Sequence, residues 1–390
     1  MRYIMIMLVA LLACAAPLRA QGQLVIVGGG LADDNDTVFA AFLEALPAPD
    51  ALIAIIPAAS GVPAQSAAAF AAQLTRRGVA PERIRIIRLA VEDDPDTPED
   101  ESLWRGHGED AGEIARLADV GAIWFTGGDQ ARILATLVRA DGTDTTMLAL
   151  IRRRLAAGAV IGGTSAGAAI MSDPMLVQGD PLSLVPGAGP DREPIETGQG
   201  LGFLRHALVD QHFGERARLI RLIAALQVRA ADRRIGLGID EDTALVVAPD
   251  QRTARVVGRG RVTVVDARTT AYPAGPTWAA RGTKVGLLGN GESLDLTSLQ
   301  RSAQAAPTPA PLSTPAPCLS ATSAAGLPAS QSELIAAISD ALAAGGETTC
   351  LVSAGQAGLA LKFSRAADAS DPWLRLDATP VTVRLEPAER

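Results

Sequence analysis

The residues best suited to covalent chemistry form the segment GTSAG at positions 163–167, which follows an apolar run. This is the G-x-S-x-G pattern of a nucleophile elbow, in which small neighbours allow a sharp turn that exposes the serine hydroxyl. A helix that begins at Ala166 would offer backbone N–H groups to an oxyanion that develops during acyl transfer. The pattern therefore predicts Ser165 as a nucleophile, although glycine-rich strand ends also occur for packing alone.

A serine hydroxyl needs a base, and the sequence has three histidines, His107, His206 and His212. His212 lies in the segment DQHF, where polar residues follow an apolar strand-like run. Polar residues at the carboxyl ends of strands point into the ligand crevice of an open α/β sheet. We therefore expect His212 to be the base, with His206 as the alternative. His107, in a polar loop, is typical of a surface residue.

The base in turn needs an orienting acid. Asp240, Glu241 and Asp242 stand together at the end of another strand-like run. Alternation along a strand places Glu241 on one face and the two aspartates on the other. Periodicity alone does not say which face meets the histidine, so all three remain candidates on this ground, as does a solvated acidic turn.

Arginines follow the predicted base. Arg216 is four residues beyond His212, and Arg218 and Arg221 are three residues apart, within a segment that has a helical pattern. Guanidinium groups bind carboxylates through paired hydrogen bonds, so these residues are candidate receivers for an acidic substrate. Arginines are also common on solvated helix surfaces, which is the structural alternative.

A second candidate binding segment, TGGDQ at positions 126–130, closes an apolar strand-like run. Gly127 and Gly128 allow backbone N–H groups to approach a ligand closely. The side-chain amide of Gln130 can hydrogen-bond a substrate.

These segments must be positioned by a regular scaffold, and from Leu24 onward continuous apolar runs alternate with helical stretches. The strand-like runs are 24–30, 51–60, 83–91, 122–128 and 159–163, and the helical stretches are 37–46, 64–77 and 147–157, the first with Asp36 as its N-cap. The alternation predicts an α/β fold with an open, mostly parallel sheet, helices on both faces and a crevice at the strands' carboxyl ends. After about Val246 short β-like pieces predict an antiparallel extension of the same domain.

Both ends of the chain depart from this pattern. Residues 1–20 predict a signal peptide, with Arg2 before an apolar run and cleavage after Ala20, so we expect a secreted or periplasmic protein. Lipid attachment at Cys14 is a minor alternative. The main domain spans 21–300, residues 301–317 form a Pro/Ala-rich linker, and 318–390 form a small C-terminal module. Cys318 and Cys350 in this module are expected to form a disulfide.

Composition limits the partners. The chain has 390 residues, 48% of them hydrophobic, and a net charge of −8. That composition provides a full core, and the absence of long basic runs argues against nucleic acid or an anionic membrane as partner. The apolar run near the N-terminus is too short to predict a membrane span. We expect no metal or cofactor, because no ligand cluster appears and the GGG at 28–30 lacks the spacing of a nucleotide-binding loop.

Four segments, taken in order, resemble the cyanophycinase group of serine peptidases, family S51, which is related to dipeptidase E. They are FTGGDQ at 125–130, GGTSAGA at 162–168, DQHFGERARLIRL at 210–222 and GIDEDTA at 238–244, within a resemblance that covers residues 24–296. The resemblance implies a flavodoxin-like fold similar to class I glutamine amidotransferases, and a triad of Ser165, His212 and Glu241. It also implies these substrate contacts: Gln130, Asp210, Gln211, Arg216, Arg218 and Arg221.

The activity implied by the resemblance is hydrolysis of cyanophycin, a poly-aspartate backbone with arginine on each side chain, to β-Asp-Arg dipeptides by an exopeptidase. One alternative is a hydrolase of small Asp-X peptides, similar to dipeptidase E. Another, from a different class, is a secreted binding protein with a relic active site. A glutamine amidotransferase is disfavoured because those enzymes have a cysteine where Ser165 stands. A homodimer is left open.

Overall fold

The computed structural model describes residues 22–185, 189–302, 331–342, 346–354, 357–365 and 373–382. The predicted signal peptide, Cys14 and most of the predicted linker lie outside these ranges, so those predictions are not addressed by the fold. Cys318 also lies outside them, and its pairing with the buried Cys350 stays a prediction. Within the described ranges, no helix is both long and apolar enough to cross a membrane.

The first of two large sheets confirms the predicted α/β fold. Five strands run parallel in the order β3, β2, β4, β5 and β1, and four antiparallel strands continue the sheet beyond β1. The parallel strands are β3 (Ile84–Ile86), β2 (Ile53–Ile56), β4 (Ala122–Phe125), β5 (Val160–Thr164) and β1 (Leu24–Val27). The antiparallel strands are β10 (Thr243–Val247), β11 (Thr253–Gly258), β14 (Ser293–Asp295) and β15 (Arg301–Ser302).

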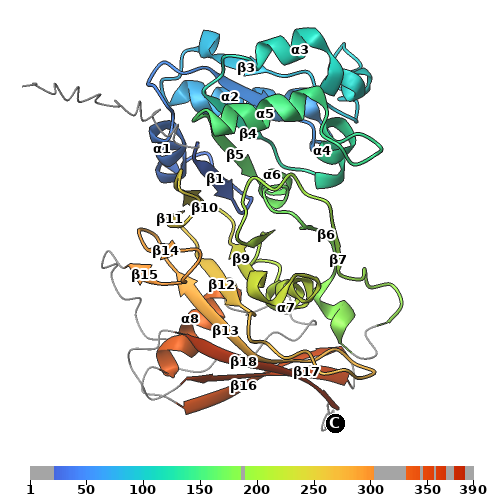
Figure 1. Ribbon diagram of the computed structural model, residues 1–390, viewed down its shortest axis with the longest axis vertical. Coiled ribbons are helices and arrows are strands. Elements are labelled where there is room, and N and C mark those ends of the chain that lie inside the picture. The colour runs from blue at the N-terminus through green and yellow to red at the C-terminus, as the bar shows by residue number, and fades with distance from the viewer. Residues whose placement is uncertain are drawn as a thin grey trace, which may run out of the picture.

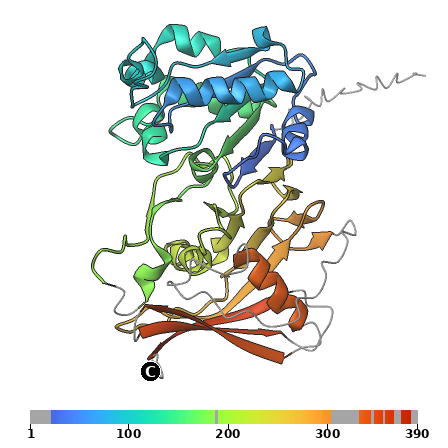
Figure 2. The same cartoon turned by 180° about the vertical axis from the view of Figure 1, so that it is seen from behind.

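Helices cover both faces of this sheet, as the alternating pattern predicted. They are α1 (Asp36–Glu44), α2 (Pro63–Arg76), α3 (Ala111–Arg116), α4 (Gln130–Leu137), α5 (Thr146–Ala156) and α6 (Ala166–Ala169). Helices α2 and α5 lie on opposite faces, α5 toward the viewer in Figure 1 and α2 in Figure 2. The N-cap of α1 is Asn35 rather than the expected Asp36, because the Asn35 side chain accepts a hydrogen bond from the N–H of Val38.

A second sheet lies below the first in Figure 1, in the order β16, β17, β18, β13, β12, β9 and β8. Its strands are β8 (Leu208–Gln211), β9 (Ile235–Ile239), β12 (Val262–Asp266), β13 (Ala280–Leu288), β16 (Gly346–Ala354), β17 (Ala357–Arg365) and β18 (Leu374–Thr382). Only β8 and β9 are parallel to each other. The prediction of one sheet with an antiparallel extension is therefore only partly right. The strand that leads into DQHF, β8, belongs to a second sheet.

Short elements join or flank the two layers. A ribbon of β6 (Met175–Gln178) and β7 (Glu196–Gly198) runs between the sheets (Figure 1). Helices α7 (Leu219–Ala225) and α8 (Gln331–Ala341) pack against the second sheet and contribute to the same hydrophobic core. The short 3-10 helices are η1 (Pro81–Arg83), η2 (Glu101–Glu109), η3 (Pro181–Leu184), η4 (Leu226–Val228) and η5 (Ala231–Arg233).

The C-terminal segment completes the second sheet. Strand β18 pairs antiparallel with β13, with Leu374 opposite Val285. Leu359, Phe363 and Leu376 are buried in the same hydrophobic core as residues of α7. Pairing satisfies the backbone groups that β13 would otherwise present at a sheet edge. The expected C-terminal module thus shares both a sheet and a core with the preceding chain.

The core between the first sheet and its outer helices depends on an aromatic group. Trp124 of β4 is 1% exposed and stacks on Phe70 with ring centroids 4.3 Å apart. Phe42 meets the same indole edge-on. This contact joins α1 and α2 to the sheet that carries Ser165.

We predict that Trp124→Ala destabilises the protein by about 3–5 kcal/mol, because it removes a large buried side chain and leaves a cavity. Urea unfolding measures the change, with Leu103→Ala as control because Leu103 is 73% exposed. Equal unfolding midpoints for the two variants would contradict this account of the core.

Candidate active site

Ser165 stands at the turn between β5 and α6 with backbone angles φ 53° and ψ −110°. This conformation is costly for a residue with a Cβ, and such strain is typical of functional turns. Small neighbours make the turn feasible. A Cβ at Gly163 would lie 2.5 Å from the carbonyl oxygen of Gly167, and one at Gly167 would lie 2.5 Å from that of Phe125. The turn therefore has the geometry that the G-x-S-x-G pattern predicts.

A chain of hydrogen bonds joins Ser165 to a histidine and a carboxylate. The hydroxyl Oγ of Ser165 lies 2.8 Å from Nε2 of His212, and Nδ1 of His212 lies 2.5 Å from Oε1 of Glu241. The structure thus brings His212 rather than His206 to the serine. It also selects Glu241 from the three acidic candidates, because the side chains of Asp240 and Asp242 bind elsewhere.

The end of β1 connects the three segments that carry these side chains. The carbonyl of Val27 accepts from the N–H of Ser165 at 3.0 Å, and that of Gly28 accepts from the N–H of His212 at 2.6 Å. The carbonyl of Gly29 accepts from the N–H of Asp242 at 2.8 Å, directly after Glu241. Three successive carbonyls therefore set the relative positions of Ser165, His212 and the loop that carries Glu241.

The glycines after β1 are required by close approach, a role that the sequence pattern did not reveal. Gly29 has φ +106°, and a Cβ there would lie 2.2 Å from Cε1 of the His212 ring. A Cβ at Gly30 would lie 2.6 Å from Oε2 of Glu241. The side chains of His212 and Glu241 therefore rest against bare backbone, and the glycines at 28–30 leave the space that they occupy. The position of these glycines directly after a buried strand was the signal available in the sequence.

The environment of His212 favours the neutral imidazole. Burial lowers the pKa of His212 from its ordinary value, an effect that the hydrogen bond from its ring to the Glu241 carboxylate opposes and the nearby charge of Arg216 reinforces. The ring is therefore neutral at pH 7, with Nε2 toward the serine hydroxyl. Since Glu241 accepts from Nδ1, the tautomer required of a general base is the one that the carboxylate stabilises.

Arg218 and Arg221 are held by a buried acid. The Asp210 carboxylate is fully buried and accepts from Nε of Arg221 at 3.0 Å and from its second terminal nitrogen at 2.6 Å. Arg218 lies 3.5 Å from the same carboxylate and also donates to the carbonyl of Gln211. Burial lowers the pKa of Arg218 to about 10, so it remains charged at neutral pH. These three expected substrate contacts thus form an internal ion-pair network beneath the His212 segment.

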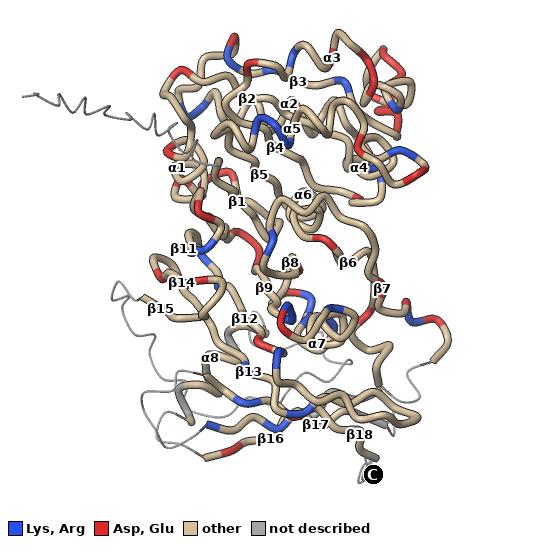
Figure 3. The backbone as a smooth tube through the Cα atoms, viewed as in Figure 1, with Lys and Arg blue, Asp and Glu red and all other residues tan. Residues whose placement is uncertain are grey.

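Arg216 differs from the other two arginines. Helix α7 begins only at Leu219, so Arg216 lies in the preceding turn and not on the expected helix. It is exposed, and within the described part of the chain no hydrogen bond or ion pair occupies its guanidinium group. Basic positions gather where β8 leads into α7 (Figure 3), and Arg216 is the one among them that faces solvent.

The remaining expected contacts are partly occupied. The amide nitrogen of Gln130 donates to the carbonyls of Leu176 and Val177 in β6, which leaves its oxygen for other partners. Gln211 is buried at the end of β8, and its Oε1 has no hydrogen-bond partner among the described residues. The backbone N–H groups of Gly127, Gly128 and Ala166 donate no hydrogen bond to any residue that the structure describes.

Asp240 and Asp242, which the sequence pattern left as alternatives to Glu241, make contacts that position the backbone instead. Asp242 accepts from the N–H of Ala32 at 2.9 Å and from the Asn35 side chain at 2.7 Å, which ties the acidic loop to the start of α1. Asp240 is buried and accepts from the N–H of Gly214 at 2.9 Å. Burial raises its pKa to about 6.

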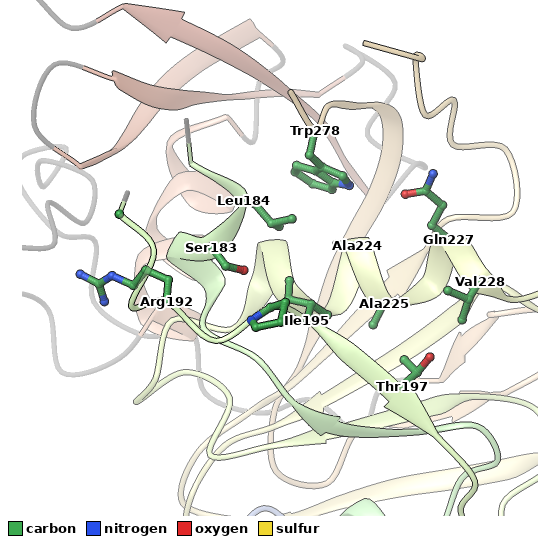
Figure 4. Close-up of a pocket in the computed structure, with 12 residues that line it drawn as sticks. Ser183, Leu184, Arg192, Ile195, Thr197, Ala224, Ala225, Gln227, Val228 and Trp278 are labelled. Carbon is green, nitrogen blue, oxygen red and sulfur yellow. The ribbon is translucent and has the colours of Figure 1, made fainter. Parts of the chain in front are cut away.

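A cavity of about 430 Å³ lies apart from this site, between η3, β7 and the end of α7 (Figure 4). Ser183, Ile195, Ala224 and Trp278 are among the residues that line it, and none of the three hydrogen-bonded side chains does. Among the residues that the structure describes, no group of three or more His, Cys, Asp or Glu is arranged to hold a metal ion.

Comparison with known proteins decides the family. The model of "Peptidase family S51" matches residues 24–255. The chain belongs to peptidase family S51. It is a serine peptidase similar to cyanophycinases.

Three curated relatives, each named cyanophycinase, show the extent of the similarity. That of Geminocystis herdmanii is 33% identical over 251 residues, which is 64% of this chain and 82% of the relative. That of Synechococcus elongatus is 35% identical over 256 residues, 65% of this chain and 70% of the relative. That of Trichormus variabilis is 33% identical over 251 residues, 64% of this chain and 75% of the relative.

One solved structure, titled as a peptidase from an acI-B1 Actinobacterium, superposes on 71% of this chain and 98% of its own length. The TM-score is 0.47 at 20% identity, and at that level the likeness adds nothing to the family assignment.

We predict that Gly29→Ala lowers the peptidase turnover number by about 10²-fold, because its Cβ displaces the His212 ring by roughly 1 Å. Gly78→Ala is the matched control, since Gly78 has φ +85° and nothing lies within 4 Å of its added Cβ. Turnover and thermal unfolding of both variants separate displacement from backbone strain. Equal turnover in the two variants would show that the glycine serves only the fold.

Proposed function

We propose that this peptidase hydrolyses cyanophycin, releasing β-Asp-Arg dipeptides from a chain end through an acyl-enzyme. The observation that carries the proposal is the hydrogen-bonded chain of Ser165, His212 and Glu241 beside the unoccupied guanidinium of Arg216. The family and the cyanophycinase relatives support the same chemistry.

In this mechanism Ser165 attacks the carbonyl carbon of a backbone peptide bond while His212 Nε2 removes the hydroxyl proton. Glu241 stabilises the imidazolium that forms. The new bond joins Oγ to carbon, and the free N–H groups of Gly127, Gly128 and Ala166 are candidates to stabilise the oxyanion. His212 then gives its proton to the leaving amine as the C–N bond breaks. Water releases the acyl group by the reverse sequence.

We expect the substrate to be recognised by polar groups near Ser165, His212 and Glu241 that have no partner among the described residues. In cyanophycin each arginine is attached through its amino group and retains a free carboxylate, which suits a charge-assisted contact with Arg216. Arg218 and Arg221 support this role indirectly, because their ion pairs with Asp210 hold the strand end and turn that present His212. The unpartnered Oε1 of Gln211 is a second candidate contact.

Export of the enzyme is a separate part of the proposal. The predicted signal peptide at 1–20 would deliver it to the periplasm or the medium, where polymer released by other cells is available. Sequencing the N-terminus of protein secreted by the native host tests this. A start near Gln21 supports cleavage, and a lipid-modified Cys14 supports the anchored alternative.

We predict that purified enzyme converts cyanophycin to β-Asp-Arg and that Ser165→Ala reduces the rate by at least about 10³-fold, because the nucleophile is lost. Chromatography and mass spectrometry of the products measure it, with Ser298→Ala as a matched control at an exposed position. Intact polymer together with cleaved Asp-X dipeptides would favour the dipeptidase-E-like alternative. Absence of all hydrolysis would favour the binding-protein alternative.

We predict that Glu241→Gln lowers kcat by roughly 10³–10⁴-fold, because an amide does not hold the required imidazole tautomer. The carboxylate also raises the pKa of His212, so its loss lowers that pKa further. The acid limb of kcat/KM therefore moves to lower pH in the variant. A pH–rate profile checks this, and an acid limb at higher pH would contradict the assignment of Glu241.

A further inference from the structure

The N-terminal end of α8 touches the loops that carry the catalytic side chains, although it lies far outside the family-matched residues 24–255. We propose that α8 completes the active site, with Gln331 and Ser332 as positioning residues for the segments of His212 and Glu241. This proposal rests on the proposed catalytic roles of those two residues.

Gln331 binds the segment that follows His212. Its backbone N–H donates to the carbonyl of Gly214 at 2.9 Å. Its side-chain Oε1 accepts from the N–H of Leu219 at 2.9 Å. Leu219 opens α7, and Arg218 at the N-cap position supplies no side-chain acceptor there. Gln331, 112 residues further along the chain, therefore caps this helix in place of a local residue.

Ser332 binds the residue that precedes Glu241. Its hydroxyl donates to Oδ1 of Asp240 at 2.7 Å, and its oxygen lies 3.3 Å from Oγ1 of Thr263. Ser332 is 0% exposed, so no water competes for these bonds. Since an ionised carboxylate only accepts, Ser332 is the donor to Asp240 and the Thr263 hydroxyl is the donor to Ser332.

Asp240 links the two catalytic loops. Its Oδ1 accepts from Ser332 and also from the N–H of Gly214, two residues beyond His212. Its Oδ2 accepts from the N–H of Arg261 at 3.1 Å. The backbone of Asp240 continues directly into Glu241. Loss of the Ser332 hydroxyl therefore alters the position of Asp240, and with it the positions of Gly214, which follows His212, and of Glu241.

A hydrophobic face fixes α8 in place. Ile335, Ile338 and Leu342 are buried in the core of the second sheet, together with Leu361 and Leu376 of β17 and β18. Figure 2 shows α8 lying across this sheet. The packed face sets the position of the helix, so its first two residues present their polar groups to the catalytic loops at a defined distance. The C-terminal segment thereby acquires a role in catalysis as well as in folding.

The charge on Asp240 offers a readout that a purely structural role would not change. Burial raises its pKa, and the negative charge of exposed Glu215 raises it as well, whereas the Ser332 hydroxyl and the N–H groups of Gly214 and Arg261 lower it. Among the residues that the structure describes, Glu215 is the one whose side-chain charge affects the pKa of Asp240, whereas Arg261 affects it through a backbone N–H. The ionised carboxylate of Asp240 accepts more strongly from these three donors than the protonated acid does. Activity that depends on them therefore falls as pH drops through its pKa.

The test is a steady-state comparison of full-length Ser332→Ala with wild type, at a temperature where both are folded. We expect kcat to fall about 10–10²-fold with KM changed by less than about twofold, because the reacting groups are displaced while the binding groups remain. The acid limb of the pH–rate profile should move to higher pH, since loss of the hydroxyl donor raises the pKa of Asp240. Glu215→Gln should move it the opposite way.

Ser339→Ala is the matched control, because Ser339 lies on the same helix and its hydroxyl faces Arg365 instead. It should leave kcat and the pH profile unchanged. Gln331→Leu should lower kcat, and Gln331→Glu should restore it, since a carboxylate keeps the acceptor for the N-terminus of α7. Ser332→Ala with lowered stability but unchanged kcat and pH profile would overturn the proposal.

Failure of the substrate proposal is distinguishable from failure of this one. If the wild type leaves cyanophycin intact, the same variants are compared by the rate at which a fluorophosphonate labels Ser165, which needs no natural substrate. Slower labelling in Ser332→Ala than in Ser339→Ala supports the positioning role, and equal rates refute it.

Discussion

Three successive carbonyl groups at the end of β1 constrain the whole site. Val27, Gly28 and Gly29 receive the N–H groups of Ser165, His212 and Asp242, which belong to three segments distant in sequence. Ser165 comes from the first sheet and His212 from the second, while the acid lies where the chain crosses from β9 to β10. The reacting geometry is therefore a property of how the two sheets meet. Any change that shifts one sheet against the other changes the hydrogen-bonded chain.

Strain and buried charge are concentrated around the same junction. Ser165, His212, Ala217 and Asp242 all have positive φ values, between 46° and 55°, although none is glycine. Such conformations persist only where surrounding contacts over-determine them. The ion pairs of Asp210 with its two arginines supply part of that constraint, because a buried acid that lost its partner would be strongly destabilising. Charged groups that were expected to bind substrate thus hold the backbone that carries His212.

The sequence predicted the parts of the site that have local signals. The small residues of GTSAG predict a strained turn, and DQH predicts polar side chains at the end of a buried strand. The second sheet could not be predicted in the same way, because LVDQ of β8 and IGLGI of β9 are apolar runs like those of the first sheet. The roles of Gly29, Asp240 and Gln331 depend on partners that lie far apart in the chain, and no spacing rule reveals such contacts.

The central claim is that Ser165 is a nucleophile activated by His212 across the junction of the two sheets. The most direct measurement is the rate at which a fluorophosphonate modifies the protein, with the labelled residue located by peptide mass spectrometry. The account predicts a single rapid adduct at Ser165 in the wild type and a rate at least about 10²-fold slower in His212→Ala, which lacks the base. Equal rates in the two proteins, or an adduct at another residue, would contradict it.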